Sequence, residues 1–475
     1  MKVLYVASEA TPFIASGGLA DVAGSLPFML RKRMVGCRVV LPLYAEVPQE
    51  MRDTLQFVGS FSVPVAWRRQ YCGVYEAHID GVIYYLLDNQ YYFKRTGIYG
   101  HYDDAERFAF FSRAVLEMLP VVDFHPDIIE ANDWQTGMIP VYYDRLYAND
   151  PWYQGIKTIF TIHNIQYQGK YSMEILEDVL GLKPEDASIM EYDGALNMMK
   201  GAIETAHSVT TVSPTYAQEI LDPAYSCGMD YILKERAWKL SGILNGIDVV
   251  SYDPETDKKL YQNYNVETVA EGKAVNKQKL QERLGLEVDP DVPLYAMVTR
   301  LVEQKGLDLV EYIANRFMYE TNAQFVLLGS GGWEYEEFFR AMENKYKGRF
   351  VAYIGFVPEL ARKIYAGADI FLMPSKSEPC GLAQMISLRY GTLPIVRETG
   401  GLKDSVTDCG DGEGNGFTFQ TYNADDMYDA MMRAMKAYND KELWPVLVER
   451  AMNCDNSWGH SASEYIRLYR SLLKE

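Results

Sequence analysis

Short apolar runs alternate with longer stretches of helical periodicity along the whole chain. The runs are KVLYVAS, CRVVLPLY, DIIEAND, KTIFTIHN and SVTTVS in the first half, and LYAMVTR, QFVLLGSG, RFVAYIGF, DIFLMPS and LPIVRETGG in the second. Strands that alternate with helices form βαβ units and parallel sheets, and nearly continuous apolar strands have both faces covered. The pattern therefore predicts an α/β protein with two doubly wound, Rossmann-like domains.

A change in composition separates the two halves. The segment GILNGIDVVSYDPETDKKL contains the turn residues Asn245-Gly246 and Asp253-Pro254 and leads into a polar, charged stretch. We expect one domain over residues 1–245 and a second over 246–460. The tail predicts an amphipathic helix over about 461–475, because Ser461 stands three residues before Glu464, the spacing of a capping box. We expect this helix to pack back on the first domain.

Charge and cysteine usage exclude several classes of function. The 475 residues include 46 basic and 65 acidic side chains, for a formal net charge of −19, which argues against nucleic acid or an anionic membrane as a partner. No apolar run is long enough for a signal peptide or a membrane span, so a cytoplasmic protein is expected. The six cysteines form no C-x-x-C pair, which favours reduced thiols over a zinc site or disulfides.

A Gly-Gly loop follows the first predicted strand. In FIASGGLADV, Gly17 and Gly18 open the next helical pattern, and backbone N–H groups at a helix N-terminus can hold an anion. The residues before them are Ala15 and Ser16, so the loop brings no cation. A tight connection without any ligand is an equally good interpretation of this motif by itself.

Two cations follow a strand in the second half. In MVTRLVEQKGLDLV, Arg300 ends the strand and Lys305 lies in the loop before the next helix. A guanidinium and an ammonium that converge can clamp a diphosphate. The alternative is a pair of solvated surface charges.

The segments MPSKSEPCGLAQM and RETGGL follow two further strands. In the first, Glu378 offers a carboxylate to a sugar hydroxyl, and the amides of Cys380, Gly381 and Leu382 open a helix that suits a sugar or a phosphate. The second adds another Gly-Gly turn that is compatible with an anion, at Thr399, Gly400 and Gly401. Glu378 as a simple partner of the helix dipole is the alternative interpretation.

Polar residues also follow two strands of the first half. ANDWQTG places Asp133 after one strand, and TIHNIQYQG places His163 and Asn164 after another. A single histidine is often structural, but ligands bind at the carboxyl ends of parallel strands, which favours a functional one here. No His, Asp and Glu cluster has the spacing of a metal site, so we expect no metal and no cofactor.

Taken in order, ten segments resemble the bacterial glycogen synthases and plant starch synthases. The likeness covers essentially the whole chain and is carried by VASEATPF, ERFAFFSRA, TIHNIQYQG, VTTVSPTYAQEI, GILNGID, QKGLDLV, IYAGADIFLMPS, EPCGL, TGGL and YIRLYRSLL. The resemblance implies a GT-B fold, in which two Rossmann-like domains face each other across a cleft. It also implies retaining transfer of glucose from ADP-glucose to the non-reducing end of an α-1,4-glucan.

The resemblance implies roles for individual residues as well. Arg300 and Lys305 would hold the donor diphosphate, and Glu378 with the amides of residues 380–382 would hold the glucose. His163 would lie against the reacting sugar. Three further residues would contribute to the same site: Asp133 and Asn245 along the cleft, and Phe356 stacked on the base.

The chain departs from the family pattern at two motifs. The first loop normally reads K-x-G-G-L, and Ala15 stands here in place of the lysine; the usual H-D-W-H is here Asn132-Asp133-Trp134-Gln135. Two alternatives to a glycogen synthase therefore stay open. One is a weakly active paralogue that binds glucan or nucleotide as a regulatory protein, and the other is a glucosyltransferase that uses UDP-glucose or makes a short oligosaccharide.

Overall fold

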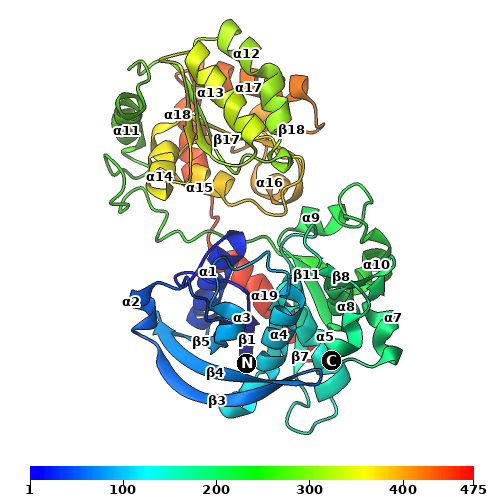
Figure 1. The fold of residues 1–475 in the computed structure, drawn as a ribbon. Coiled ribbons are helices and arrows are strands. Elements are labelled where there is room, and N and C mark those ends of the chain that lie inside the picture. The colour runs from blue at the N-terminus through cyan, green and yellow to red at the C-terminus, as the bar shows by residue number, and fades with distance from the viewer. Residues whose placement is uncertain (475) are drawn as a thin grey trace. The chain divides into compact units, whose positions relative to one another are not determined.

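The computed structural model describes residues 1–474 and divides the chain into two compact units. Unit 1 comprises Met1–Ile243 together with the segment that starts at Trp458, and unit 2 comprises Leu244–Ser457 (Figure 1). The chain therefore passes between the units at 243/244 and at 457/458, whereas the sequence placed these boundaries at 245/246 and 460/461.

Unit 1 is built on a nine-stranded sheet in the order β12-β11-β7-β6-β1-β2-β5-β4-β3. Neighbouring strands from β12 to β5 are parallel. The strands are β1 Lys2–Val6, β2 Gly36–Pro42, β3 Gln56–Val65, β4 Arg68–Ile79, β5 Val82–Asp88, β6 Ile128–Asn132, β7 Lys157–Ile162, β11 Ser208–Thr211 and β12 Leu240–Gly242. A small antiparallel sheet joins β8 Lys170–Tyr171, β9 Glu191–Tyr192 and β10 Ala195–Asn197.

The five strands predicted in the first half are all present, but one edge of the sheet is not parallel. Strands β3, β4 and β5 form an antiparallel meander, and the sequence analysis did not predict it. Its tight turn is Asp80-Gly81, where both residues have positive φ (48° and 79°), as a two-residue hairpin requires. The expectation of a wholly parallel sheet was therefore wrong at this edge, although an Asp-Gly pair between β-rich runs is a recognisable hairpin signal.

The helices of unit 1 pack against this sheet and between its connections. They are α1 Gly18–Lys32, α2 Gln49–Arg52, α3 Gln90–Phe93, α4 Asp104–Val121, α5 Met138–Tyr142, α6 Ile175–Asp178, α7 Ala187–Met190, α8 Met198–Thr205, α9 Pro214–Glu219, α10 Asp230–Glu235 and α19 Trp458–Leu472. The central strands β1 and β6 are almost wholly buried, as strands covered on both faces must be.

Unit 2 has a six-stranded parallel sheet in the order β15-β14-β13-β16-β17-β18. Its strands are β13 Leu294–Val298, β14 Gln324–Gly329, β15 Phe350–Ile354, β16 Ile370–Met373, β17 Leu393–Arg397 and β18 Phe417–Phe419. Its helices are α11 Val269–Leu284, α12 Leu307–Glu320, α13 Trp333–Lys345, α14 Pro358–Gly367, α15 Ala383–Arg389, α16 Gly400–Ser405, α17 Ala424–Asn439 and α18 Leu443–Met452. Numbered from its own first strand, the sheet has the Rossmann order 3-2-1-4-5-6.

The last helix, α19, packs on unit 1 beside α1 (Figure 1). It buries Trp458, Ala462, Tyr465, Ile466, Tyr469 and Leu472. The Tyr469 hydroxyl donates to Oε2 of Glu130, a fully buried carboxyl of β6 that also accepts from Thr161. The predicted capping role of Ser461 was wrong: the helix begins three residues earlier, and Ser461 is buried within it.

We predict that Glu130 makes the stability of unit 1 depend on pH. Burial raises the pKa of Glu130 to about 7. A carboxyl group whose pKa is higher in the folded than in the unfolded state favours folding at low pH, and this contribution is lost as pH rises from about 4.5 to about 7. Glu130→Gln should therefore remove a decline in melting temperature between pH 5 and pH 8 that the unmodified chain shows. If the melting temperatures of the two proteins changed with pH by the same amount across that range, the assignment to Glu130 would be contradicted.

Candidate active site

Each sheet has one place where the order of its strands reverses. In unit 1 it lies between β1 and β6, and in unit 2 between β13 and β16. Open parallel sheets bind ligands outside the carboxyl ends of the strands at such a point. The predicted residues follow these four strands: the Gly17-Gly18 loop after β1, Asp133 after β6, Arg300 and Lys305 after β13, and Glu378 after β16.

The Gly-Gly loop of unit 1 is held by an internal carboxylate. Oε2 of the buried Glu9 accepts a hydrogen bond from the backbone N–H of Ser16 at 2.5 Å, and the backbone N–H of Gly17 also bonds to Glu9. Gly17 is the N-cap of α1. A Cβ atom on Gly18 would meet open space, so the loop remains accessible at that residue. The sequence analysis expected these amides to face a ligand, but the structure gives those of Ser16 and Gly17 a partner within the chain.

Asp133 organises the next part of unit 1. Its Oδ1 accepts from the backbone N–H groups of His163 at 2.7 Å and of Asn164 at 3.4 Å, so these three predicted residues lie together. Asp133 has φ 59° and ψ 176°, a strained conformation for a residue with a Cβ atom. Burial of the carboxyl group, with a smaller contribution from the nearby Glu9, raises its pKa to about 7. The buried carboxyl group of Glu9 and the half-buried one of Asp133 therefore lie near each other at the carboxyl ends of β1 and β6.

His163 is half-buried, and its surroundings keep the ring neutral. Burial lowers its pKa to about 3. Nε2 lies 2.8 Å from Oδ1 of Asn132, and the amide group of Asn132 donates to the Val6 carbonyl oxygen. Because Oδ1 can only accept, Nε2 carries the proton and Nδ1 is left as the acceptor nitrogen. The ring is thereby oriented by a residue at the end of β6.

In unit 2 the structure joins two of the predicted residues directly. Nζ of Lys305 donates to Oε2 of Glu378 at 2.6 Å, and the hydroxyl of Ser375 donates to the same oxygen at 3.1 Å. The side chains of Lys305 and Glu378 are only 17% and 8% exposed. The pair links the loops that follow β13 and β16, so it lies at the point where the strand order of unit 2 reverses.

The segment from Thr399 to Gly401 packs tightly on the loop of Glu378. A Cβ atom on Gly400, which has φ 44°, would lie 1.9 Å from the Glu378 carbonyl oxygen, and one on Gly401 would lie 2.3 Å from that of Cys380. Any side chain at either position would force these loops apart. Glycine is therefore required at both positions by close packing, and this explains the two glycines of the TGG motif without a ligand.

Two predicted residues in unit 2 carry buried oxygen atoms that lack a partner. Among residues 1–474, Oγ1 of Thr399 and Oδ1 of Asn245 accept or donate no hydrogen bond. The backbone N–H of Asn245 does bond to the thiol of Cys380, whose pKa burial raises to about 12. Since buried polar atoms are rarely left without a partner, these two are candidates to bind a ligand.

The structure does not connect every predicted residue. Arg300 and Phe356 are exposed, and the guanidinium group of Arg300 has no hydrogen bond or ion pair within the part of the chain that the structure describes. Gly381 has φ 71° and precedes Leu382, the N-cap of α15. These residues lie on loops after β13, β15 and β16.

Comparisons with known proteins decide the family. A family model described as the starch synthase catalytic domain matches residues 2–235, and one described as glycosyl transferases group 1 matches residues 278–444. The glycogen synthase of Clostridium beijerinckii is 50% identical and that of Exiguobacterium sibiricum 51%, each over 99% of both chains. The chain belongs to the glycogen and starch synthase family.

A solved structure agrees with this assignment. The catalytic domain of starch synthase IV from Arabidopsis thaliana, bound to ADP and acarbose, superposes with a TM-score of 0.91 at 35% identity, covering 100% of this chain and 99% of that one. This glycogen and starch synthase family member therefore has the GT-B fold and is a hexosyltransferase. No helix among its described residues is long and apolar enough to span a membrane.

Sequence reasoning missed several residues of this family member that shape the site. Glu9 and Asn132 hold the Gly-Gly loop and His163, while Ser375 supports Glu378. Gln384 supports the loop of Gly381 by donating to its carbonyl oxygen. Each stands within about ten residues of a predicted site residue, but only the fold shows which of them point inward.

We predict that Glu9 positions the first loop through its hydrogen bonds. Glu9→Ala frees the N–H groups of Ser16 and Gly17 and should lower kcat/KM for glucosyl transfer about tenfold, the effect of one or two lost hydrogen bonds. Glu9→Gln keeps an acceptor oxygen and should stay within a few fold of the unmodified chain. Glu46→Ala is the matched control, because Glu46 also accepts from a loop glycine, Gly97, but at an exposed site. Equal activity of all three variants would show that Glu9 does not position this loop.

Proposed function

We propose that this protein is a glycogen synthase that transfers glucose, with retention, from ADP-glucose to the non-reducing end of an α-1,4-glucan. The observation that carries the proposal is the Lys305–Glu378 pair at the strand reversal of unit 2, in a chain about 50% identical to bacterial glycogen synthases over its full length. A cation and a carboxylate at this position match the two parts of a nucleotide-sugar donor.

The donor would bind through charge and hydrogen bonding. Arg300, which has no partner among the described residues, and Lys305 would hold the diphosphate. Glu378 would accept hydrogen bonds from glucose hydroxyls once the sugar lies between it and the cations. The free oxygen atoms of Thr399 and Asn245 would take further sugar or phosphate contacts, and exposed Phe356 would stack on the base.

The proposed chemistry needs the leaving diphosphate to be stabilised while the sugar becomes oxocarbenium-like. Fixed cations and backbone amides in a water-poor site supply this stabilisation, so the proposal includes neither a metal nor a cofactor. In unit 1, neutral His163 and the half-buried Asp133 would bind the sugar. The proposal also includes a cytoplasmic location, which agrees with the six free cysteines.

A weakly active regulatory paralogue and a UDP-glucose enzyme are the alternatives. A chain that no longer catalysed transfer would have no need to keep Arg300, Lys305 and Glu378 together. The test is to incubate the purified protein with a glycogen primer and ADP-glucose or UDP-glucose in parallel and to measure chain extension. Extension with ADP-glucose, and much less with UDP-glucose, is expected. A preference for UDP-glucose would overturn the donor assignment, and no extension with either would favour the regulatory paralogue.

We predict that the cations of unit 2 are needed for use of the donor. Arg300→Ala and Lys305→Ala should each reduce kcat/KM for ADP-glucose about ten- to a hundredfold, since a charge-assisted hydrogen bond contributes roughly 1.5–3 kcal/mol. Glu378→Ala should lower kcat more than it raises KM.

The same two loops provide a matched control for these variants. Nζ of Lys376 donates to Glu303 at 2.8 Å, but the two side chains are 55% and 68% exposed. Such exposed pairs contribute little, so Lys376→Ala should keep nearly full activity. Near wild-type rates in the Arg300, Lys305 and Glu378 variants would place the donor elsewhere.

We predict that a lysine at residue 15 improves catalysis. Ala15 is exposed next to the Gly-Gly loop, where family members carry lysine, so a longer side chain has room. Ala15→Lys should raise kcat/KM for the preferred donor by up to about a hundredfold by adding one charge-assisted bond to the leaving diphosphate. Steady-state kinetics with both donors measures the effect. An unchanged or lower value for both donors would contradict the prediction. It would show that another group already stabilises the leaving diphosphate, or that the new lysine forms an ion pair with Glu9 instead.

A further inference from the structure

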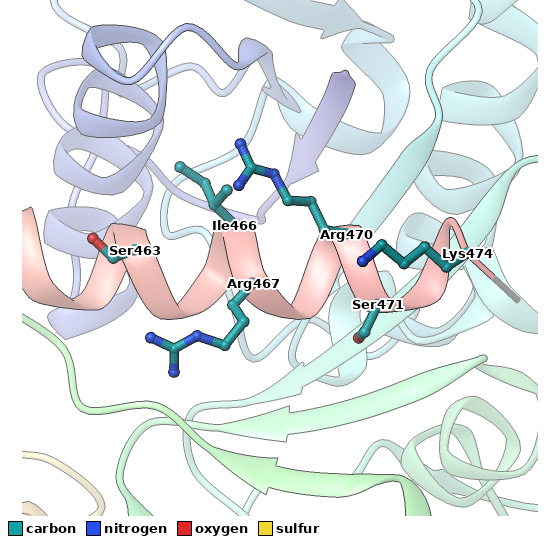
Figure 2. Close-up of a pocket in the computed structure, with 6 residues that line it drawn as sticks. All are labelled: Ser463, Ile466, Arg467, Arg470, Ser471 and Lys474. Carbon is teal, nitrogen blue, oxygen red and sulfur yellow. The ribbon is translucent and has the colours of Figure 1, made fainter.

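Helix α19 of unit 1 carries a hollow of about 440 Å³. Its lining residues are Ser463, Ile466, Arg467, Arg470, Ser471 and Lys474. Figure 2 shows Arg467 and Arg470 leaving the helix on opposite sides, while the side chain of Lys474 reaches back along it. All three cations are exposed, and the one apolar lining residue, Ile466, is buried.

A fourth cation reaches this face from α1. Nη1 of Arg33, the C-cap residue of α1, donates to Oγ of Ser463 at 2.6 Å. The hollow therefore combines three positive side chains with the hydroxyl groups of Ser463 and Ser471, and Arg33 contacts it through Ser463. Hydroxyls and cations together are the usual partners of a phosphate group.

The three cations of α19 are not neutralised within the protein. Among residues 1–474, the side chains of Arg467, Arg470 and Lys474 take part in no hydrogen bond or ion pair. Arg433, by contrast, is paired with Asp408 and Asp429. Acidic side chains outnumber basic ones by 65 to 46 in this chain, yet the cations of α19 have no acidic partner among these residues.

The helix dipole explains only part of this cluster. Basic residues are favourable in the last turn of a helix, where Arg470 lies. Arg33 is likewise favoured at the C-terminal end of α1, but the dipole does not account for Arg467, which precedes the last turn of α19. It also gives no reason for the side chains to enclose a hollow.

We propose that this hollow on α19 binds a small phosphorylated metabolite. Its volume lies within the range of small-molecule sites, about 300–1,000 Å³. Each guanidinium group offers paired donors that suit phosphate oxygens. The strongly acidic character of the rest of the chain repels a long polyanion such as a nucleic acid, but it affects a ligand that fits within the cluster much less.

Binding here would act on the segment that completes unit 1. The chain returns to unit 1 at Trp458, and α19 is the helix that follows. A ligand that binds only the folded helix stabilises it by mass action, so saturating ligand should raise the melting temperature of the protein. This readout does not depend on glucosyl transfer.

The test is calorimetric titration of the full chain at low ionic strength, with ADP present to saturate the donor site. Inorganic phosphate and glucose 1-phosphate are the two probes, and about one equivalent of either should bind. Arg467→Ala/Arg470→Ala should weaken binding at least about tenfold and abolish the rise in melting temperature. Arg69→Ala/Lys170→Ala is the matched control, because it removes the same charge from exposed positions of unit 1 and should bind like the unmodified chain.

The remaining outcomes separate this site from the donor site. Tighter binding of glucose 1-phosphate than of phosphate supports recognition of a sugar phosphate, and equal binding supports recognition of the phosphate group alone. Arg300→Ala should still bind about one equivalent of the probe. Loss of this binding in the Arg300 variant would place the anion in the donor site and overturn the proposal. Absence of binding, unchanged binding in the α19 variant, or binding of heparin but of neither small probe would also overturn it.

Discussion

Both units depend on one topological constraint: the first strand of each large sheet lies in the middle of that sheet. The next strands extend to one side and the later ones to the other, so the connections after β1 and β6, or after β13 and β16, leave in opposite directions. This separation leaves the carboxyl ends of the two central strands uncovered. Residues far apart in the sequence, such as Lys305 and Glu378, meet there because the sheet brings the ends of their strands together.

The two units use opposite electrostatic solutions at these strand ends. In unit 1, carboxyl oxygen atoms of Glu9 and Asp133 accept hydrogen bonds from backbone N–H groups of neighbouring loops. Unit 2 pairs a half-buried lysine with a buried glutamate and leaves Arg300 without a partner. Burial of a charged group is costly unless hydrogen bonds compensate it, so the carboxyl groups of unit 1 fix loop geometry, while the cations of unit 2 suit an anionic ligand.

The α19 cluster is a third group of charged side chains, and it lies in unit 1. In a chain with a net charge of −19, this cluster gathers positive side chains from two helices. Arg33 ends α1, and Arg467 and Arg470 lie on α19, so their proximity depends on the packing of the chain's last helix beside its first. The buried contact between Tyr469 and Glu130 helps to hold that helix in place.

Periodicity and motif order by themselves determined the fold class, the ten predicted strands, the family, and which loops carry the candidate residues. These features are local in the sequence, because an apolar strand or a TGGL turn is encoded by adjacent residues. Local patterns did not show the β3–β5 meander, whose edge strand is half exposed and lacks a strong apolar signal, or the true start of α19 at Trp458. Only the tertiary structure decided that Lys305 pairs with Glu378, that Glu9 occupies the amides of the Gly-Gly loop, and that Arg33 joins the cations of α19. The physical reason is that hydrogen bonds and ion pairs depend on distances of about 3 Å between side chains, which the register of the strands and the packing of the helices set and the spacing of residues in the sequence does not.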